Sequence, residues 1–126
     1  MLLAQDVDTP TEEEKLVAEL ELLGVRYLSR QSSYQASHVR SPEALLADLV
    51  RQPCARVRAA VIAVLLSHPE YASAVPVALE QLPTLGRLTL QLFYMAALLL
   101  QQEYAGRLRS FLQVRWQWLP DFFRLN

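Results

Sequence analysis

The sequence has few of the residues on which several common kinds of site depend. Its 126 residues include one cysteine, two histidines and three glycines. Cys54 has no partner for an intramolecular disulfide, so we expect a buried structural thiol and a reducing, cytoplasmic location. Three isolated glycines cannot form a phosphate-binding loop, because such a loop needs several of them close together.

Signals for catalysis are equally sparse. His38 and His68 have no cysteine or acidic cluster around them at metal-ligand spacing, and no G-x-S-x-G elbow occurs. A Ser-His-Asp triad assembles in space and would leave no such pattern, so an all-α enzyme stays as the alternative. We expect no cofactor, no metal and no enzymatic activity.

Long hydrophobic runs are also missing. The nearest approach is Leu88 to Leu100, which is 13 residues long and contains Gln91. A helix that spans a bilayer needs about 20 apolar residues, so this run predicts a buried core helix. The first residues, MLLAQDVD, turn acidic too early for the apolar part of a signal peptide. We therefore expect neither export nor a membrane partner.

Charge is unevenly distributed along the chain. Residues 1–24 contain seven acids and one lysine, a net charge of −6, whereas residues 25–126 contain eleven arginines and six acids, a net charge of +5. The overall charge of −1 therefore hides an acidic head on a mildly basic body. Arginine presents a planar fork that suits carboxylates and phosphates.

Start and stop signals predict helices along most of the chain. Thr11 and Glu14 form a capping box, and Ser41-Pro42-Glu43 gives an N-cap followed by a first-turn proline. No useful run has the period of a strand. The helices we expect cover residues 12–23, 42–51, 54–67, 76–82, 85–102 and 106–118. This pattern predicts an all-α fold, a small right-handed stack of five or six helices, in one domain (11–126) after a flexible lead (1–10).

Apolar periodicity predicts which side chains are buried. We expect residues 85–102 to form the central helix, apolar on all sides except for a polar stripe. The last helix should direct four side chains inward. The stripe is Arg87, Gln91 and Tyr94; the expected core includes Val61, Leu92 and Met95, with Leu108, Phe111, Leu112 and Leu119 from the last helix.

A helix pair occurs about twice. The apolar stretches Ala55 to Leu66 and Gly86 to Leu100 each follow a shorter leucine-bearing segment and a proline, and each precedes a Glu-Tyr-Ala tripeptide, at 70–72 and 103–105. Such repetition predicts a stacked helical-repeat module. The first pair, ALLADLVRQPCARVRAAVIAVLL, resembles a HEAT unit. Where HEAT units place a turn aspartate this chain has Gln52, and Asp48 is the only substitute nearby.

Two regions are candidates for binding. In the last helix Arg109, Gln113 and Trp116 share a face away from Leu108 and Leu112, and arginine beside tryptophan is typical of interface hot spots. The polar loop 29–41 and its surroundings offer further arginines and a tyrosine. These candidates are Arg26, Arg30, Tyr34, Arg40 and Arg56.

These features predict a small protein-interaction adaptor or scaffold that accompanies a larger enzyme or complex. The alternative is a nucleic-acid-binding helical repeat that uses the same arginines, joined by Arg58 and Arg107. The calculated pI of about 6.1 disfavours that alternative, and the acidic N-terminal helix could cover the arginines. The sequence leaves open whether the protein forms homo-oligomers.

Overall fold

Helices account for all regular secondary structure in the part of the chain that the structure describes, residues 9–28 and 33–124 of a computed structural model. The all-α prediction is therefore confirmed for these residues. Residues 1–8 of the predicted flexible lead and residues 29–32 of the predicted loop lie outside them. Residues 33–41 form no regular structure, as the loop prediction required.

The local signals at the helix starts work as predicted. Helix α2 (Glu12–Leu22) begins with a complete capping box, in which the Glu14 backbone donates to Thr11 Oγ1 at 3.1 Å and the Thr11 backbone donates to Glu14 Oε1 at 2.9 Å. Gly24 follows the helix with a φ of +89°, which a glycine adopts without strain. Helix α3 (Pro42–Val50) begins after Ser41 with its proline in the first turn.

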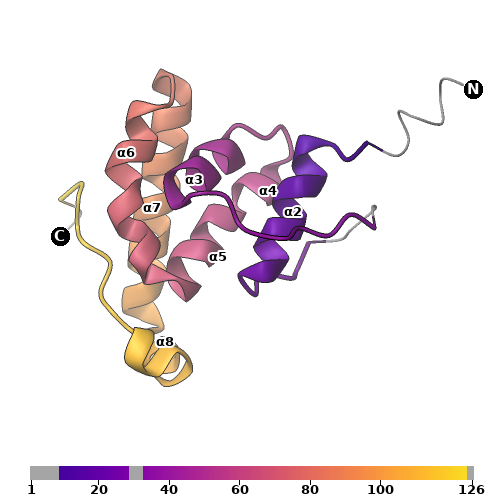
Figure 1. Cartoon of the computed structure of the whole chain (residues 1–126). Helices are drawn as coiled ribbons and strands as arrows, with labels where there is room; N and C mark the ends of the chain where they lie inside the picture. Colours follow the sequence, from indigo (N-terminus) through magenta and orange to yellow (C-terminus); the bar gives the residue numbers. More distant parts are fainter. Residues whose placement is uncertain (1–8, 29–32, 125–126) are drawn as a thin grey trace, which may run out of the picture.

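Two helix pairs follow one another along the chain. In the first pair α3 is followed by α4 (Ala55–Arg58) and α5 (Ala60–Ser67), which are separated only at Ala59. In the second, the 3₁₀ segment η1 (Pro69–Ala74) and α6 (Val75–Glu80) precede α7 (Thr84–Glu103). Helix α3 contacts α6 and α5 contacts α7, so each helix of one pair lies beside its counterpart (Figure 1). The resemblance to HEAT units stays a prediction.

The buried core lies between these layers, and α2 covers one side of it. Helices α2, α3, α5 and α7 contribute fully buried leucines and valines, among them Leu16, Leu20, Leu45, Leu46, Leu49, Val61, Val64, Leu65 and Leu90. Val61 is buried as predicted. The N-terminal helix therefore caps one side of the first helix pair (Figure 1).

Helix α7 is buried on one face only, which corrects two predictions. Leu92 is 64% exposed and is not a core residue, and Met95 is partly exposed. Tyr94, which we placed on a polar stripe, is fully buried. Its ring can be buried because its hydroxyl donates to the Pro120 carbonyl at 2.5 Å, so the polar atom keeps a partner.

The C-terminal segment also differs from the prediction. Helix α8 (Ala105–Leu112) is followed by the 3₁₀ turn η2 (Gln113–Arg115), and no helix reaches Trp118. Leu112 and Leu119 are buried as expected and Leu108 partly so, but Phe111 is 69% exposed. After η2 the chain turns back and runs along α7 (Figure 1).

The fully buried side chain of Gln101 attaches this tail to α7. Its Nε2 donates to the Gln117 carbonyl at 2.9 Å, and its Oε1 accepts from the Leu119 backbone at 2.9 Å. Both ends of the amide are thus satisfied. Phe122 and Phe123 add ring contacts to Tyr94, with centroids 5.3 and 5.7 Å apart.

Candidate protein-binding interface

Arg109 contacts two indole rings that also contact each other. Its guanidinium carbon is 5.2 Å from the ring centroid of Trp116 and 5.3 Å from that of Trp118. The two indoles meet edge to face, with centroids 5.0 Å apart and planes inclined by 72°. At these distances the cation is attracted to both ring faces. We call these three residues the tryptophan–arginine cluster.

The cluster brings together Arg109 and Trp116. The sequence predicted that they share one face of a single helix, but the structure joins them through a turn. Helix α8 ends at Leu112, and a chain reversal, not a continuous helix, returns Trp116 to Arg109. Gln113, the third residue of that expected face, forms the reversal with a φ of 53°. Trp118, which the sequence analysis did not select, completes the cluster.

The cluster is fixed at both ends. Trp118 stands between Gln117 and Leu119, whose backbone groups bind Gln101 on α7. At the other end, Arg115 Nη1 donates to the Ser67 carbonyl at 3.1 Å and ties η2 to the end of α5. A side chain held in this way loses little conformational freedom when a partner binds.

The same segment of the chain also carries exposed apolar side chains. Val114 is 98% exposed and Phe111 is 69% exposed, while Trp118 is about half exposed and Trp116 partly so. Residues 105–120 also contain three arginines and no acid. Tryptophan and arginine are the residues most enriched at interface hot spots. This end of the molecule therefore has the composition of a contact surface.

The backbone at Gln113 is strained, which gives a testable effect on stability. A non-glycine residue with φ 53° and ψ −116° costs on the order of 1–3 kcal/mol. We expect Gln113→Gly to raise the free energy of unfolding by up to about 1 kcal/mol, since glycine removes strain but adds freedom to the unfolded chain. Gln113→Val should lower it by about 1 kcal/mol or more. Urea melts of the three proteins measure both; a glycine variant less stable than the valine variant would contradict the strain.

The other predicted binding residues lie elsewhere and have other contacts. Arg30 is outside the described residues. Arg26 is exposed beside a small hollow of about 200 Å³, and Tyr34 is partly buried. Arg56 lies over the Tyr27 ring at 5.9 Å, while the Tyr27 hydroxyl donates to the Arg56 carbonyl at 3.1 Å. Arg56 belongs to α4 and Tyr27 follows α2, whereas α8 lies at the far end of α7 (Figure 1).

Arg40 is occupied by three carboxylates. Its backbone and Nε donate to Glu19 Oε1 at 2.9 Å, its Nη2 donates to Glu19 Oε2 at 2.7 Å, and its Nη1 reaches Glu12 and Asp48. Burial raises the pKa of the Glu19 carboxyl, but hydrogen bonds and charge from Arg40 outweigh it and hold that pKa below its usual value. The acidic helix therefore does cover this arginine. We call Glu12, Glu19 and Asp48 the carboxylate cage.

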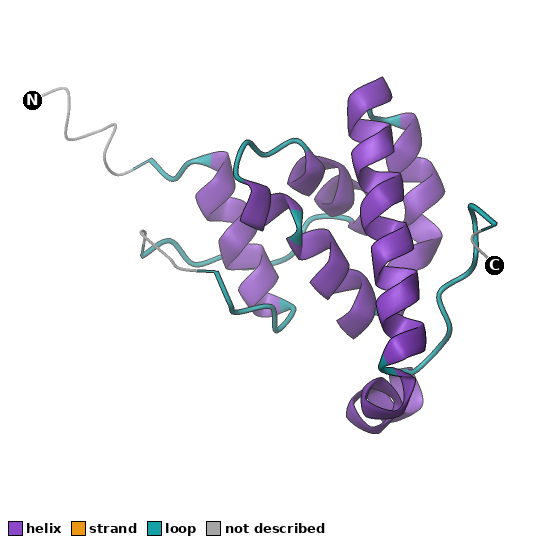
Figure 2. Ribbon diagram, turned by 180° about the vertical axis from the view of Figure 1, so that it is seen from behind, coloured by secondary structure: helices purple, strands orange, loops and turns teal. Residues whose placement is uncertain are grey.

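A second exposed surface, which the sequence analysis missed, follows α7. Leu85, Leu88, Leu92 and Leu99 are each more than half exposed, and their spacings of 3, 4 and 7 residues place them on one side of the helix. Figure 2 shows this helix along the front of the molecule, with the tail beside it. We call these four residues the leucine face. Their heptad-like spacing was the available signal, and it was interpreted as core.

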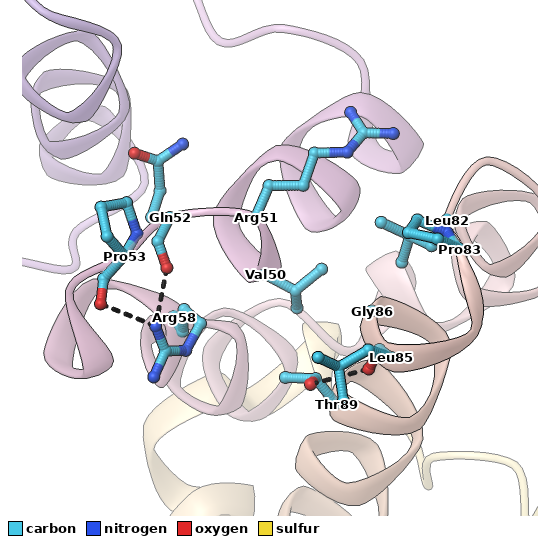
Figure 3. A pocket seen from close by; sticks show the side chains of 10 residues that line it. All are labelled: Val50, Arg51, Gln52, Pro53, Arg58, Leu82, Pro83, Leu85, Gly86 and Thr89. Atoms are coloured by element: carbon cyan, nitrogen blue, oxygen red, sulfur yellow. Dashed lines mark hydrogen bonds between the residues drawn. The ribbon is translucent and has the colours of Figure 1, made fainter.

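A groove of about 530 Å³ adjoins the N-terminal end of the leucine face. Its apolar wall comes from Val50, Leu82, Pro83 and Leu85 (Figure 3). Arg51 and Arg58 stand at its edge: Arg51 contacts Asp48 and the Gln81 carbonyl, and Arg58 Nη1 donates to the carbonyls of Gln52 and Pro53 at 2.8 Å each. The groove is therefore apolar inside, and its rim carries the positive charge of Arg58, whereas the charge of Arg51 is paired with that of Asp48.

Within residues 9–28 and 33–124 no three His, Cys, Asp or Glu side chains gather as metal ligands would. The ring Nε2 of His68 lies 2.6 Å from the Leu23 carbonyl, which ties the end of α5 to the end of α2. No single helix of the described chain is long and apolar enough to cross a bilayer; the bent pair Ala55–Ser67 and Pro69–Glu80 passes by length and composition alone.

Comparisons of the chain with protein-family models, with curated proteins and with solved structures return no match. The geometry of the chain itself therefore carries the functional argument.

Proposed function

We propose that this chain is a small protein-interaction module, an adaptor that binds a protein partner through the tryptophan–arginine cluster and the exposed Phe111 and Val114 beside it. One observation carries the proposal: an arginine cation that contacts two indoles, on a surface anchored to α7 and α5. Rigid aromatic and arginine side chains of this kind supply most of the binding energy in many interfaces. A cytoplasmic location and work beside a larger enzyme belong to the same proposal.

The nucleic-acid alternative receives less support from the arginines. Arg40 is neutralised by the carboxylate cage, Arg51 is paired with Asp48, and Arg58 is bound to carbonyl oxygens. A nucleic-acid footprint needs guanidinium groups free to meet phosphates along one surface. At the α8 end Arg115 is bound to the Ser67 carbonyl and Arg109 contacts the two indoles, so this end offers only a small electrostatic surface for such a role.

The double variant Arg109→Ala/Trp116→Ala tests the proposal. We expect it to stay folded and to weaken partner binding by about 2 kcal/mol or more, roughly 30-fold in Kd, as truncation of paired hot-spot anchors does. The partner is first identified by co-purification at native expression and mass spectrometry. Its affinity for each variant is then measured by calorimetry with purified proteins.

The matched control is Tyr27→Ala/Arg56→Ala, which removes the other arginine–aromatic pair of the described chain, on the α2 side. Its binding should equal that of the unaltered protein. Because Trp116 is partly buried, Arg109→Glu provides a second variant that alters an exposed residue alone. If both cluster variants bind normally while the control binds weakly, the interface lies beside loop 29–41 instead.

A salt titration separates the two partner classes. Binding to nucleic acid should fall steeply with salt through counterion release, whereas an aromatic protein interface should respond weakly.

A further inference from the structure

The leucine face is an unpartnered apolar surface on an ordered helix. Leu85 is 76% exposed and Leu92 is 64% exposed, yet the opposite side of the same helix contains the fully buried Leu90, Tyr94 and Gln101. Helix α7 carries only two charged residues, Arg87 and Glu103, in its 20 positions. A monomer rarely leaves so continuous an apolar strip in water.

The spacing of the residues in the leucine face suits packing against another helix. The four leucines with Met95 repeat at a mean spacing near 3.5 residues, which is the spacing that keeps one seam facing a partner helix. Helix α7 is about 30 Å long, so the seam extends over several turns. The tail occupies the opposite side, since it is held by Tyr94 and Gln101.

The two ends of the strip have opposite charge. The N-terminal end has the positive end of the helix dipole and the groove, at whose rim Arg58 is bound only to carbonyl oxygens and so keeps its positive charge. At the C-terminal end stand the exposed Glu103 and the negative end of the dipole. The next arginine, Arg107, belongs to α8, which turns away from the α7 axis (Figure 2).

A surface with opposite charges at its two ends is complementary to itself after a two-fold rotation. An antiparallel arrangement centred between Leu92 and Met95 places Leu88 of one copy opposite Leu99 of the other. It also brings Glu103 of each copy to the basic groove of the other. A parallel arrangement would instead place like ends together.

We infer that the leucine face of α7 binds a second copy of this chain, forming an antiparallel two-fold dimer with Glu103 at the basic groove of the partner subunit. The inference concerns a different face from the proposed adaptor surface. Two tryptophan–arginine clusters then remain open, one on each subunit. A two-fold interface of this isologous kind is the commonest form of homo-oligomer.

Sedimentation equilibrium over a range of concentrations tests the inference on the full chain. The monomer mass is 14.3 kDa, and the expected result is twice that value at micromolar concentration. Leu92→Asp should raise the dimer dissociation constant by about 100-fold or more, because each dimer would bury two unpaired carboxylates near its axis. Circular dichroism should show the variant folded, since Leu92 is exposed in the single chain.

Val77→Asp is the matched control, an exposed apolar residue of α6 away from the leucine face. It should leave the mass unchanged. Orientation is tested by cross-linking with a short bismaleimide in a Cys54→Ser background: Leu92→Cys should link two copies, and Leu85→Cys should not, since antiparallel copies hold that position about 25 Å apart.

A monomer at all concentrations overturns the inference, as does a dimer that Leu92→Asp leaves intact. Efficient cross-linking of the Leu85→Cys variant would show that the two copies are parallel and would overturn the antiparallel arrangement. None of these outcomes decides whether the proposed adaptor surface binds a partner, because that proposal is tested separately by variants at Arg109 and Trp116.

Discussion

Replacing Arg40 by alanine is expected to lower the free energy of unfolding by about 2–4 kcal/mol at pH 7, somewhat less than the cost of breaking a fully buried charge pair, because the Arg40 side chain is partly exposed. The change leaves Glu12, Glu19 and Asp48 close together without their shared cation. The largest part of this cost comes from Glu19, because Glu19 is only 7% exposed and Arg40 donates to both of its carboxylate oxygens.

The effect should depend on pH in a defined direction. The folded-state pKa of Glu19 is lowered, so the stability that this pair supplies is complete above the unfolded carboxyl pKa of about 4.3. It is lost as the pH falls through the lower folded-state pKa. The difference between the unaltered protein and Arg40→Ala should therefore shrink below about pH 4.

Urea melts at pH 7 and pH 3.5 measure this difference, with Arg26→Ala as the control. Arg26 is an exposed arginine near the same helix, and its removal should cost less than about 0.5 kcal/mol. An Arg40→Ala cost that is equally small at pH 7 would mean that the cage does not hold α2 against α3.

Replacing Gln101 by alanine should lower the free energy of unfolding by about 2–4 kcal/mol. The truncation creates a cavity at a fully buried position, and it leaves the Leu119 amide and the Gln117 carbonyl without partners. Because the tail depends on these bonds, residues 116–124 should also become sensitive to proteases. Chemical melts and limited proteolysis with mass spectrometry provide the two measurements.

Gln102→Ala is the control, because Gln102 is exposed on the next position of the same helix. It should change stability by less than about 0.5 kcal/mol and leave the tail resistant. Equal behaviour of the two variants would show that the tail does not depend on Gln101.

Local features of the fold were predictable because their causes are local. The capping box at Thr11 and the proline after Ser41 each act within one helical turn, and both are confirmed. The break near Pro53 and the start of α7 after Pro83 follow from the same short-range sterics.

The orientation of α7 was not predictable in this way. Both of its sides are rich in leucine, so periodicity could not show which side a neighbouring element covers. The tail decides it: Tyr94 and Gln101 are buried because Pro120, Gln117 and Leu119 satisfy their polar atoms. Those contacts connect residues 16 to 26 positions apart, which no local pattern records.

The candidate site was predictable only in part. Arg109 and Trp116 were selected for their chemistry, and they are in contact, although a strained turn at Gln113 brings them together instead of a helix. Arg40 was selected as a candidate binding residue, and whether the acidic helix covers it was left open. In the structure Glu12 and Glu19 of that helix are paired with it.

The tryptophan–arginine cluster is the place where we propose that a partner binds. Amide hydrogen exchange of the protein, alone and with its co-purified partner bound, tests this directly. We predict that the amides of residues 105–118 become more protected in the complex. Protection confined to residues 33–41 and α2, with no change at 105–118, would contradict the account.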